Sequence, residues 1–494
     1  MTDICVPIVA ENVEKVKSDI KEAEKHADLI EIRLDFIKDM TKEKIKELLN
    51  GNNKKIIITC RNKKDRGNFD GAEEEKLELL NASIESGCDY IDIENDSKLL
   101  NQIIENKKTK TIVSYHNFDE TPSLEALNQK YNEIKSKKPD SIKIVTQANS
   151  INDNFIIFEL LKGKDDLTAF CMGIKGQMSR ILAPKYNSLL TFASLEDGKE
   201  SASGQISIKE MKDLYHVPLL DKDTNVLGVI GKHAENSQSK NMHNPVFVNK
   251  KLNYVYIPFK MDKEEVNEFM KNFRKSNFAG SSVTIPHKEY IMDFLDGIDE
   301  TAKAIGAVNT IVNEQGRLTG YNTDYYGAVS ALKEKTSLSG KKILIIGAGG
   351  AARALVYGFK KENSEITVIN RTKEKAQKLA DEFEIKSDEL SNAKNLINAN
   401  DIIINTTSIG MHPNAGESII KEDEFVSGKL VMDIVYNPLK TKFVENAQKA
   451  GCEVIMGDKM LIYQAAGQFE LWTKNRPEFE EMQNALQRAI RGDL

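Results

Sequence analysis

The first 220 residues alternate short apolar runs with amphipathic helical patterns, and this alternation limits the possible folds more than any other feature. The runs are rich in β-branched residues, as buried strands are, and they cover residues 4–9, 28–34, 55–60, 89–94, 111–115, 141–145, 167–172 and 189–194. Strands that alternate with helices indicate a parallel sheet with crossover helices. Eight such units in about 200 residues predict a (β/α)8 barrel, the TIM barrel. An open, doubly wound sheet is the alternative.

The composition excludes several classes of protein. A chain of 494 residues is too long for one compact core, so two or three domains are expected. The net charge is −6 and no basic stripe is present, so nucleic acid is not an expected partner. No apolar run approaches the roughly 18 residues of a membrane helix. The first residues lack the pattern of a signal peptide, and we therefore expect a cytoplasmic protein with no membrane partner.

The five cysteines indicate a reducing environment. Their number is odd, and none of them forms a C-x-x-C pair. Cysteines of this kind in a long chain are usually buried, reduced thiols. We expect neither a disulfide framework nor a metal site.

Polar side chains gather at the predicted strand ends. Chemistry in a (β/α)8 barrel takes place at the C-terminal ends of the strands and in the loops that follow. The candidates in these places are Glu31, Arg33, Arg61, His116, Lys143, Met172, Arg180, Ser201 and Gln205.

Lys143 is the most informative of these candidates because it lies inside an apolar strand, between Ile142 and Ile144. Burial penalises the ammonium form and favours the neutral amine, which is a nucleophile. A lysine in such a place is typical of enzymes that form a Schiff base with a carbonyl substrate. A purely structural lysine is the alternative, and a structural histidine is the alternative for His116.

The segments DLIEIRLD, TCR, VSYHNF, SIKIV, CMGIKGQMSR and SASGQIS resemble those of type I 3-dehydroquinate dehydratases in order and spacing. The resemblance implies that Lys143 forms an imine with the ring ketone and that His116 is the general acid and base. It implies that Glu31 orients His116 or the substrate. The resemblance also implies that the carboxylate and hydroxyls of the substrate are bound by Arg33, Arg61 and Arg180. Met172 would pack against the ring, and the lid over the substrate would contain Ser201 and Gln205.

This half departs from the family pattern at two positions. The glutamate expected four residues after Arg61 is Asp65, which is shorter by one methylene. The lid usually has a proline before its glycine, and here Ser203 precedes Gly204. We expect looser support around the site and a more flexible lid, with Lys143 and His116 unaffected.

The second half contains a glycine-rich turn between a strand and a helix. The run ILII leads into Gly347, Ala348, Gly349, Gly350 and Ala351 and then into a helical pattern. Small residues in this context let backbone amides approach a pyrophosphate. A second strand ends about twenty residues later at Asn370, Arg371 and Thr372, where NAD-binding folds usually place an acid. An amide followed by a cation and a hydroxyl favours a 2′-phosphate there, so we expect NADP(H).

Further polar residues surround this turn. They offer many hydrogen bonds and little charge, which suits a polyhydroxylated ring better than an apolar substrate. They are Ser237, Ser239, Thr284, Lys288, Asn309, Asp324, Tyr436, Gly457 and Gln464.

From about Leu227 to Trp472 these segments resemble shikimate dehydrogenases. The resemblance implies that Lys288 and Asp324 bracket the reacting oxygen, with Lys288 as the proton donor. Ser237 and Ser239 would bind the carboxylate. The ring would be bound by Thr284, Asn309, Tyr436 and Gln464. The turn up to Arg353 would hold the pyrophosphate, and Thr406, Ser408, Met411 and Gly457 would line the cofactor site. Glu235 is unusual for the family, and we expect it to point to solvent.

Together the two resemblances imply a bifunctional enzyme that dehydrates 3-dehydroquinate and reduces the product to shikimate. The expected domains are a barrel at 1–220, a substrate-binding lobe at 226–325 plus 458–494, and a Rossmann-like NADP domain at 326–457. Two alternatives are that the second half acts on quinate and that one half is a non-catalytic module. The expected partners are small-molecule substrates, and a homodimer is possible.

Overall fold

The computed structural model describes residues 2–106, 108–412 and 414–491, so the expected domain ends at residues 1 and 494 lie outside it. The chain forms two compact units. One comprises the residues up to Val226 together with Lys251–Asn272, and the other comprises Leu227–Lys250 and the residues from Phe273 onward.

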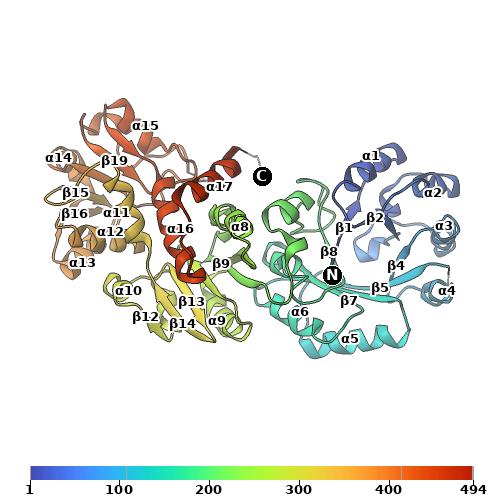
Figure 1. Ribbon diagram of the computed structural model, residues 1–494. Coiled ribbons are helices and arrows are strands. Elements are labelled where there is room, and N and C mark those ends of the chain that lie inside the picture. Colours follow the sequence, from blue (N-terminus) through green and yellow to red (C-terminus); the bar gives the residue numbers. More distant parts are fainter. Residues whose placement is uncertain (1, 107, 413, 492–494) are drawn as a thin grey trace. The chain divides into compact units, whose positions relative to one another are not determined.

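The first unit contains an eight-stranded sheet in the order β7-β6-β5-β4-β3-β2-β1-β8 (Figure 1). Its strands are β1 (Asp3–Ile8), β2 (Leu29–Arg33), β3 (Lys55–Thr59), β4 (Tyr90–Glu94), β5 (Lys110–Asn117), β6 (Ser141–Gln147), β7 (Leu167–Met172) and β8 (Leu190–Phe192). All of the ladders are parallel, and β1 pairs with both β2 and β8. Between β8 and β7, the Leu189 N–H donates to the Leu167 carbonyl oxygen at 3.0 Å. The predicted barrel is confirmed, and the open-sheet alternative is wrong.

Helices alternate with these strands and lie outside them (Figure 1). They are α1 (Val13–Ala23), α2 (Lys42–Leu49), α3 (Glu73–Glu85), α4 (Leu100–Glu105), α5 (Leu124–Ser136), α6 (Asp153–Leu161) and α7 (Gln177–Ile181). Three of them begin where a polar residue caps the free amides: Asn12, Thr41 and Ser123 each accept a hydrogen bond from the backbone N–H three residues on. Local sequence therefore sets where these helices start.

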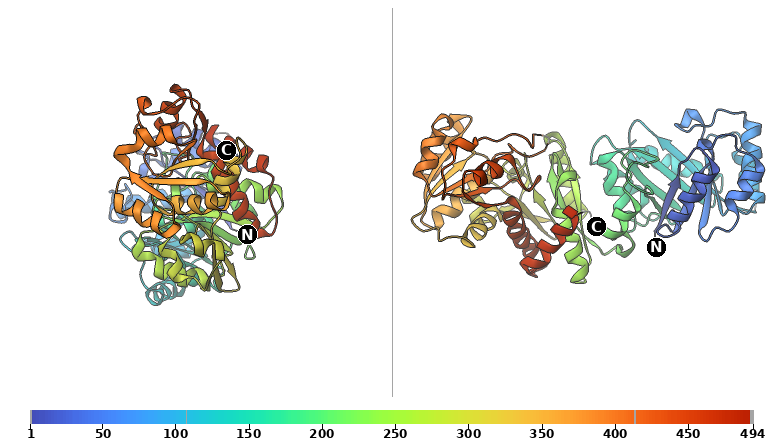
Figure 2. Two further views of the ribbon diagram at one scale, coloured as in Figure 1. Left: turned by 90° about the vertical axis from the view of Figure 1, so that its left-hand side faces the viewer. Right: turned by 90° about the horizontal axis from the view of Figure 1, so that it is seen from above.

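Two further sheets follow in the chain, and Figure 2 draws their strands in colours from green to red. The first sheet is mixed, in the order β10-β9-β11-β13-β14-β12. Its strands are β9 (Asn225–Gly231), β10 (Tyr254–Lys260), β11 (Gly280–Val283), β12 (Gly297–Ile298), β13 (Thr310–Glu314) and β14 (Arg317–Tyr321).

The second sheet is parallel and has the order β17-β16-β15-β18-β19-β20, which is the strand order of a Rossmann fold. Its strands are β15 (Lys342–Ile346), β16 (Glu365–Asn370), β17 (Lys386–Glu389), β18 (Ile402–Asn405), β19 (Leu430–Asp433) and β20 (Glu453–Ile455). The order reverses between β15 and β18, and ligands of such folds bind at the carboxyl ends of the strands beside this point. The predicted Rossmann-like part is confirmed.

The remaining helices surround these two sheets. They are α8 (Ser239–Asn249), α9 (Val266–Lys275), α10 (Glu300–Ile305), α11 (Asp324–Lys333), α12 (Gly350–Lys361), α13 (Lys373–Phe383), α14 (Ala393–Ala399), α15 (Lys442–Lys449), α16 (Gly457–Thr473) and α17 (Phe479–Arg491). Among the described residues, none of these helices or those of the first unit combines the length and low charge needed to cross a bilayer.

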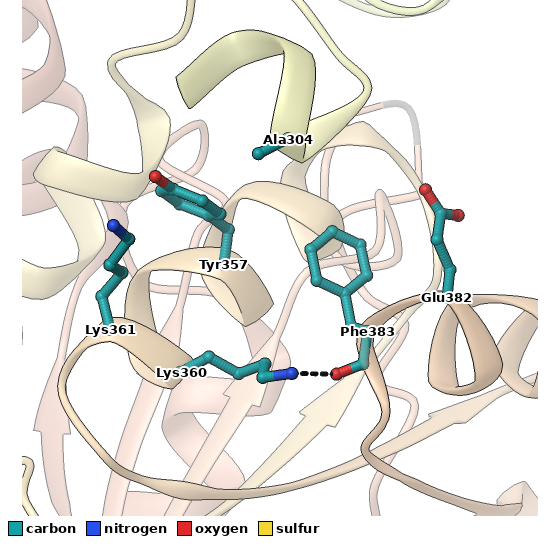
Figure 3. A pocket seen from close by; sticks show the side chains of 6 residues that line it. All are labelled: Ala304, Tyr357, Lys360, Lys361, Glu382 and Phe383. Carbon is teal, nitrogen blue, oxygen red and sulfur yellow. Dashed lines mark hydrogen bonds between the residues drawn. The ribbon is translucent and has the colours of Figure 1, made fainter. Parts of the chain in front are cut away.

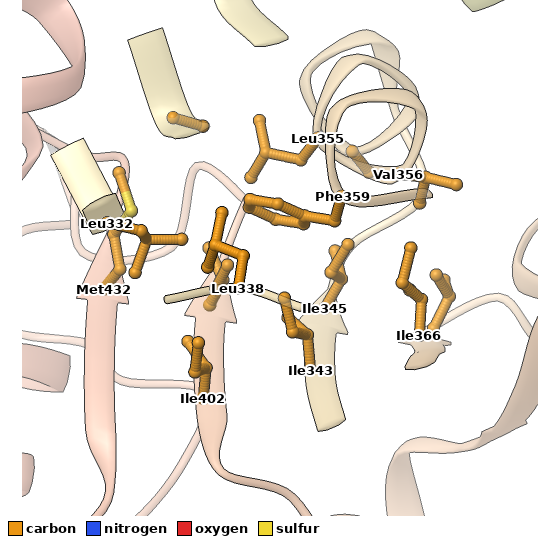
Figure 4. Packing of buried hydrophobic residues seen from close by; sticks show 14 of the residues in the cluster. Leu332, Leu338, Ile343, Ile345, Leu355, Val356, Phe359, Ile366, Ile402 and Met432 are labelled. Atoms are coloured by element: carbon orange, nitrogen blue, oxygen red, sulfur yellow. The ribbon is translucent and has the colours of Figure 1, made fainter. Parts of the chain in front are cut away.

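One face of the parallel sheet packs against α11 and α12 (Figure 4). Phe359 of α12 is fully buried among Ile343, Ile345 and Ile402 of the strands. Burying one such side chain contributes roughly 1.5–3 kcal/mol. This packing sets the direction of α12, whose first turn follows the glycine-rich sequence. All five cysteines are buried and outside disulfides, as predicted.

Candidate active sites

Side chains from the even-numbered strands meet inside the barrel. Lys143 of β6 is 5% exposed. Its Nζ lies 3.0 Å from Asp92 Oδ2 of β4, 3.8 Å from Glu31 Oε1 of β2 and 4.1 Å from the ring centre of Phe192 in β8. Alternate strands of a (β/α)8 barrel contribute the side chains of one interior layer. The lysine predicted from the apolar run therefore belongs to a polar layer and has two acidic neighbours.

Arg61 closes the layer from the end of β3. One of its nitrogens lies 2.9 Å from Asp92 Oδ1, and another donates to the Ser114 hydroxyl at 2.9 Å and lies 3.6 Å from Glu94 Oε1. Burial alone would raise the pKa of Asp92, but the charges of Lys143 and Arg61 hold it far below its usual range. Asp92 is therefore a fixed negative charge beside the amine.

Asp92 and Glu94 were not among the predicted site residues. They lie two apart in the run DYIDIE, so their side chains face the same side of β4. Glu31 and Arg33 in β2 have the same spacing, so a signal for Asp92 and Glu94 was present in the sequence. Glu94 also binds Lys76, a fully buried lysine of α3, at 2.9 Å.

Glu31 and Arg33 have separate environments. Glu31 Oε1 accepts a hydrogen bond from the Thr59 hydroxyl at 2.6 Å, and Lys143 Nζ lies 3.8 Å from the same oxygen. Arg33 forms a two-pronged ion pair with Asp35, at 2.9 Å and 2.7 Å. The structure therefore places Glu31 beside the amine and leaves Arg33 partly neutralised.

His116 lies near the end of β5 and stacks on Phe118, with ring centres 5.6 Å apart. Burial, followed by the positive charges of Arg61 and Lys143, lowers its pKa well below the ordinary 6.5, against the opposing effect of Asp92. The imidazole is therefore neutral at physiological pH and able to accept a proton.

Arg180 of α7 is a buried cation, 1% exposed. One of its nitrogens donates to the Phe192 carbonyl oxygen at 3.3 Å, while Nε and Nη2 have no hydrogen-bond partner. No carboxylate pairs with it among the described residues, and burial lowers its pKa to about 10. An unneutralised guanidinium in this state favours an anionic ligand that accepts two parallel hydrogen bonds. Met172 is buried in the cluster that contains Phe170, the ring beneath Arg180.

The predicted lid is tied to the loop after β7. The Gly173 N–H donates to the Ser203 carbonyl oxygen at 2.9 Å, and the Ser201 N–H donates to Gln205 Oε1 at 2.7 Å. Gly204 has φ +77°, and an added Cβ would lie 2.2 Å from the Gly173 oxygen, so only glycine fits. At the other departure, Asp65 Oδ2 is buried without a hydrogen bond, and burial together with Glu94 raises the pKa of Asp65.

A second cluster forms around Lys288 and Asp324 in the second unit. Lys288 Nζ is hydrogen-bonded to Asp324 Oδ2, and Asn309 Nδ2 donates to Asp324 Oδ1 at 2.8 Å. Asp324 is the first residue of α11, where the helix dipole stabilises a negative charge. Asn309 Nδ2 also lies 3.5 Å from Gln464 Oε1 of α16, and Asn309 Oδ1 accepts the Thr323 N–H at 2.9 Å. The lysine, carboxylate, and both amides predicted for one site are therefore together.

The predicted hydroxyl groups form a second patch. The Ser237 hydroxyl donates to Ser239 Oγ at 3.1 Å, and the hydroxyl of the half-buried Tyr436 is hydrogen-bonded to Ser237. Thr284 is held at its backbone, where its N–H donates to the Ile230 oxygen at 2.9 Å. Glu235 is half-buried and its Oε2 is shielded from solvent, so the expectation that it points to solvent is wrong.

The glycine-rich turn lies at the carboxyl end of β15, beside the Lys288 cluster. Gly347 has φ +122°, and an added Cβ would lie 2.4 Å from Thr406 Oγ1. A Cβ at Gly349 would meet no heavy atom within 4 Å, whereas one at Gly350 would lie 3.4 Å from Lys288 Cβ. The turn therefore has open space on one side and the lysine on the other.

Other predicted cofactor residues lie at neighbouring strand ends. Asn370 Nδ2 donates to the Thr372 carbonyl oxygen at 2.9 Å, and Arg371 and Thr372 are exposed. Met411 is 39% exposed, although it is apolar. Gly457 begins α16, where an added Cβ would lie 2.4 Å from the Val435 oxygen. Arg353 is engaged elsewhere, because it pairs with Glu382 at 2.9 Å and donates to the Ile305 oxygen at 2.6 Å.

A hollow of about 410 Å³ lies elsewhere on the second unit (Figure 3). It is lined by Ala304, Tyr357, Lys360, Lys361, Glu382 and Phe383. Lys360 donates to the Phe383 carbonyl oxygen, and Glu382 is paired with Arg353. No predicted site residue lines this hollow.

Models of known families match four consecutive segments. Residues 4–221 match type I 3-dehydroquinase, 229–311 the shikimate dehydrogenase substrate binding domain, 330–435 shikimate / quinate 5-dehydrogenase, and 459–487 the shikimate 5′-dehydrogenase C-terminal domain. The matches follow the division between the Lys143 and Lys288 clusters.

Curated relatives and solved structures agree with these matches. A chloroplastic bifunctional 3-dehydroquinate dehydratase/shikimate dehydrogenase of Arabidopsis thaliana is 37% identical, covering 95% of this chain and 82% of the relative. A shikimate dehydrogenase (NADP(+)) of Methanocaldococcus jannaschii is 43% identical over 54% of this chain and 98% of its own length. A crystal structure of a shikimate dehydrogenase with NADP+ has 42% identity and a TM-score of 0.53, covering 55% of this chain and 97% of that one.

Proposed function

The chain belongs to the family of bifunctional 3-dehydroquinate dehydratase/shikimate dehydrogenases, and on this premise we propose that Lys143 and His116 carry the first reaction and Lys288 and Asp324 the second. The two reactions are a lyase step and an NADP-dependent oxidoreductase step. The observation that carries the proposal is the presence of two separate lysine–carboxylate clusters, one in each matched half, with Lys143 buried and Lys288 partly buried. We assign the dehydratase to residues 1–220, the substrate lobe to 226–325 plus 458–494, and the cofactor domain to 326–457. A homodimer stays a prediction.

In the dehydratase, the Lys143 ammonium first gives a proton to the neutral His116, and the free amine adds to the ring ketone. His116 returns that proton to the hydroxyl of the resulting carbinolamine, which leaves as water as the protonated imine forms. The imine withdraws electrons from the neighbouring carbon, so His116 can remove its proton and then return a proton to the departing hydroxyl. Hydrolysis of the imine releases 3-dehydroshikimate and restores Lys143. Asp92 stabilises each positive charge that forms on the Lys143 nitrogen.

The rest of the barrel site would hold the substrate. Arg180 is the proposed carboxylate ligand, because its two unpaired nitrogens match two carboxylate oxygens. Arg61 and Arg33 would bind ring hydroxyls, with Met172 against the ring. Ser201 and Gln205 would close the lid, since the lid already contacts the loop that leads to Arg180.

The residues of the second unit fit NADPH, which supplies a hydride when bound. The turn at Gly347–Ala351 has open space at Gly349, and the first amides of α12 lack intrahelical partners, as in pyrophosphate sites. Asn370, Arg371 and Thr372 would take the 2′-phosphate, and Thr406, Ser408, Met411 and Gly457 would line the remaining cofactor surface.

Lys288 would give a proton to the substrate oxygen as the ketone is reduced. Asp324 and Asn309 hold the lysine and the oxygen in place, since Asn309 donates to Asp324 and lies near Gln464. Ser237 and Ser239 would bind the substrate carboxylate, and Thr284, Tyr436 and Gln464 the ring hydroxyls.

A coupled assay on the full chain tests both activities. With 3-dehydroquinate and NADPH, we expect NADPH oxidation and formation of shikimate, and borohydride should trap substrate on Lys143. Accumulation of 3-dehydroshikimate without NADPH loss would contradict the second assignment. Oxidation of quinate as fast as shikimate, measured in reverse with NADP+, would favour the quinate alternative.

The pH dependence of dehydration tests the role of His116. Because the pKa of His116 is well below 6.5, the imidazole stays neutral until the pH falls to its lowered pKa. Only below that pKa does it lose its ability to accept a proton. We expect the acidic limb of kcat/KM to lie below pH 6.5. His26→Gln, which changes an exposed histidine of the same unit, should leave the profile unchanged. A limb at or above pH 6.5 would show that His116 is not the base in this environment.

A further inference from the structure

The ends of β18 and β19 carry a buried polar pair that the proposed mechanism does not use. Asn405 is the last residue of β18 and Asp433 the last of β19, and they are register partners in the parallel ladder. Both are 0% exposed, and Asn405 Nδ2 donates to Asp433 Oδ1 at 3.0 Å. The pair lies at the carboxyl edge of the sheet, where ligands of this fold bind.

Asn405 organises the loop that follows β18. Its Oδ1 accepts hydrogen bonds from the Thr407 N–H at 3.0 Å and from the Thr407 hydroxyl at 2.7 Å. Its Nδ2 also lies 3.4 Å from the Ile409 carbonyl oxygen. These contacts hold residues 406–411, the loop proposed to line the cofactor site.

Asp433 organises the loop that follows β19. Its Oδ1 accepts the Val435 N–H at 3.0 Å, and its Oδ2 accepts the Thr441 hydroxyl at 2.6 Å. Thr441 Oγ1 in turn accepts the Val444 N–H at 3.2 Å and caps α15. Both ends of the segment 434–441 are therefore tied to one carboxylate, and Tyr436 lies within that segment.

The segment reaches the substrate residues on its other side. The Tyr436 hydroxyl is hydrogen-bonded to Ser237. The carbonyl oxygens of Ile434 and Val435 lie against Gly457, the first residue of the helix that carries Gln464. The Ile434 N–H donates to the Asn405 carbonyl oxygen at 3.1 Å, which joins the two loops a second time.

We infer that Asn405 and Asp433 are positioning residues of the dehydrogenase, which together set the cofactor loop 406–411 against the substrate segment 434–441. The inference rests on the proposed site assignment. A carboxylate suits this place because it only accepts hydrogen bonds, and three donors converge on it, from the end of β18, the loop after β19 and the cap of α15. An amide would turn one N–H toward a group that is itself a donor.

Three variants of the full chain separate the two loops. Asn405→Ala removes the tie to the cofactor loop, and we expect KM for NADPH to rise more than KM for 3-dehydroshikimate. Thr441→Val removes one tie of the substrate segment, and we expect the reverse. Asp433→Asn disturbs both loops, and both KM values should rise by about tenfold, as for the loss of a hydrogen bond to a charged group. Dehydration by the same chain should not change in any variant.

Matched controls distinguish positioning from general stability. Thr441→Ser keeps the hydroxyl and should restore the wild-type KM values. Asp401→Asn changes a carboxylate at the opposite end of β18, where Oδ2 accepts the Lys342 N–H at 2.9 Å, and should leave both KM values unchanged. If Asp433→Asn does not fold, the inference is tested by comparing the KM values of Thr441→Val with those of Thr441→Ser.

The inference is overturned if Asp433→Asn leaves both KM values within about twofold of wild type, or if the variants lose activity only in proportion to their unfolded fraction. It is also overturned if Asn405→Ala and Thr441→Val affect the two substrates equally. Failure of the wild-type chain to oxidise NADPH with 3-dehydroshikimate would instead contradict the proposed function, before any variant is compared.

Discussion

Replacing Lys143 by alanine is expected to abolish dehydration of 3-dehydroquinate and to leave reduction of 3-dehydroshikimate unchanged. Without the amine no imine can form, and the proton beside the ketone keeps its low acidity. Loss of a covalent nucleophile lowers kcat by about 10⁴-fold or more. The measurement is the rate of each reaction, assayed separately on the same preparation, with borohydride trapping as a second readout.

The control for this change is Lys164→Ala. Lys164 is a half-buried lysine of the same unit, its Nζ donates to the Leu160 carbonyl oxygen at 2.7 Å, and burial lowers its pKa. Both activities should survive its loss. Dehydration by Lys143→Ala at the wild-type rate would exclude the imine mechanism. Loss of both activities would mean that Lys143 supports folding instead. Because Lys143 is paired with Asp92, such a role would appear as a lower thermal unfolding temperature of the variant.

Replacing Lys288 by methionine is expected to have the opposite effect, with reduction lost and dehydration retained. Methionine has nearly the same length and shape, but it has no proton to donate to the oxygen of the reacting ketone. Removal of a general acid lowers the rate by about 10²–10⁴-fold. The loss should appear in kcat, while KM for NADPH changes little, because the residues proposed to hold the cofactor phosphates are intact.

Lys303→Met is the matched control, because Lys303 is an exposed lysine of the same unit. It should leave both reactions unchanged. Full activity of Lys288→Met would remove Lys288 from the mechanism. A rise in KM for NADPH with unchanged kcat would assign Lys288 to cofactor binding. This alternative has a structural basis, because Lys288 lies beside Gly350 of the glycine-rich turn.

Much of the fold follows from local patterns. The eight apolar runs of the first half became eight strands, with ends shifted by at most two residues, because period and β-branched content are local properties. The glycine-rich turn was placed correctly between β15 and α12, since its positive φ and close contacts leave few alternatives to small residues. The choice of barrel over open sheet needed β8 to lie between β1 and β7, and its pairing with β1 joins residues far apart in the chain.

The candidate sites were predicted less completely. Lys143 was found from its apolar neighbours, but Asp92, its closest acidic partner, was not, because the partner lies 51 residues away on another strand. Arg353 follows the glycine-rich turn in sequence, yet its guanidinium pairs with Glu382 of α13. Glu235 was expected in solvent, and only the packing around it decides that its Oε2 is shielded.

The sequence by itself determined the order of strands and helices, the place of the glycine-rich turn, and the two lysines singled out as candidates, because each depends on residues close together in the chain. The tertiary structure decided which charges lie beside each lysine, that Arg180 is buried without a carboxylate partner among the described residues, and that Asn405 and Asp433 join two loops. The physical reason is that pKa values, ion pairs and loop positions depend on distances between side chains. Folding brings together side chains from strands that are far apart in the chain. The number of residues between two strands does not reveal how close their side chains lie.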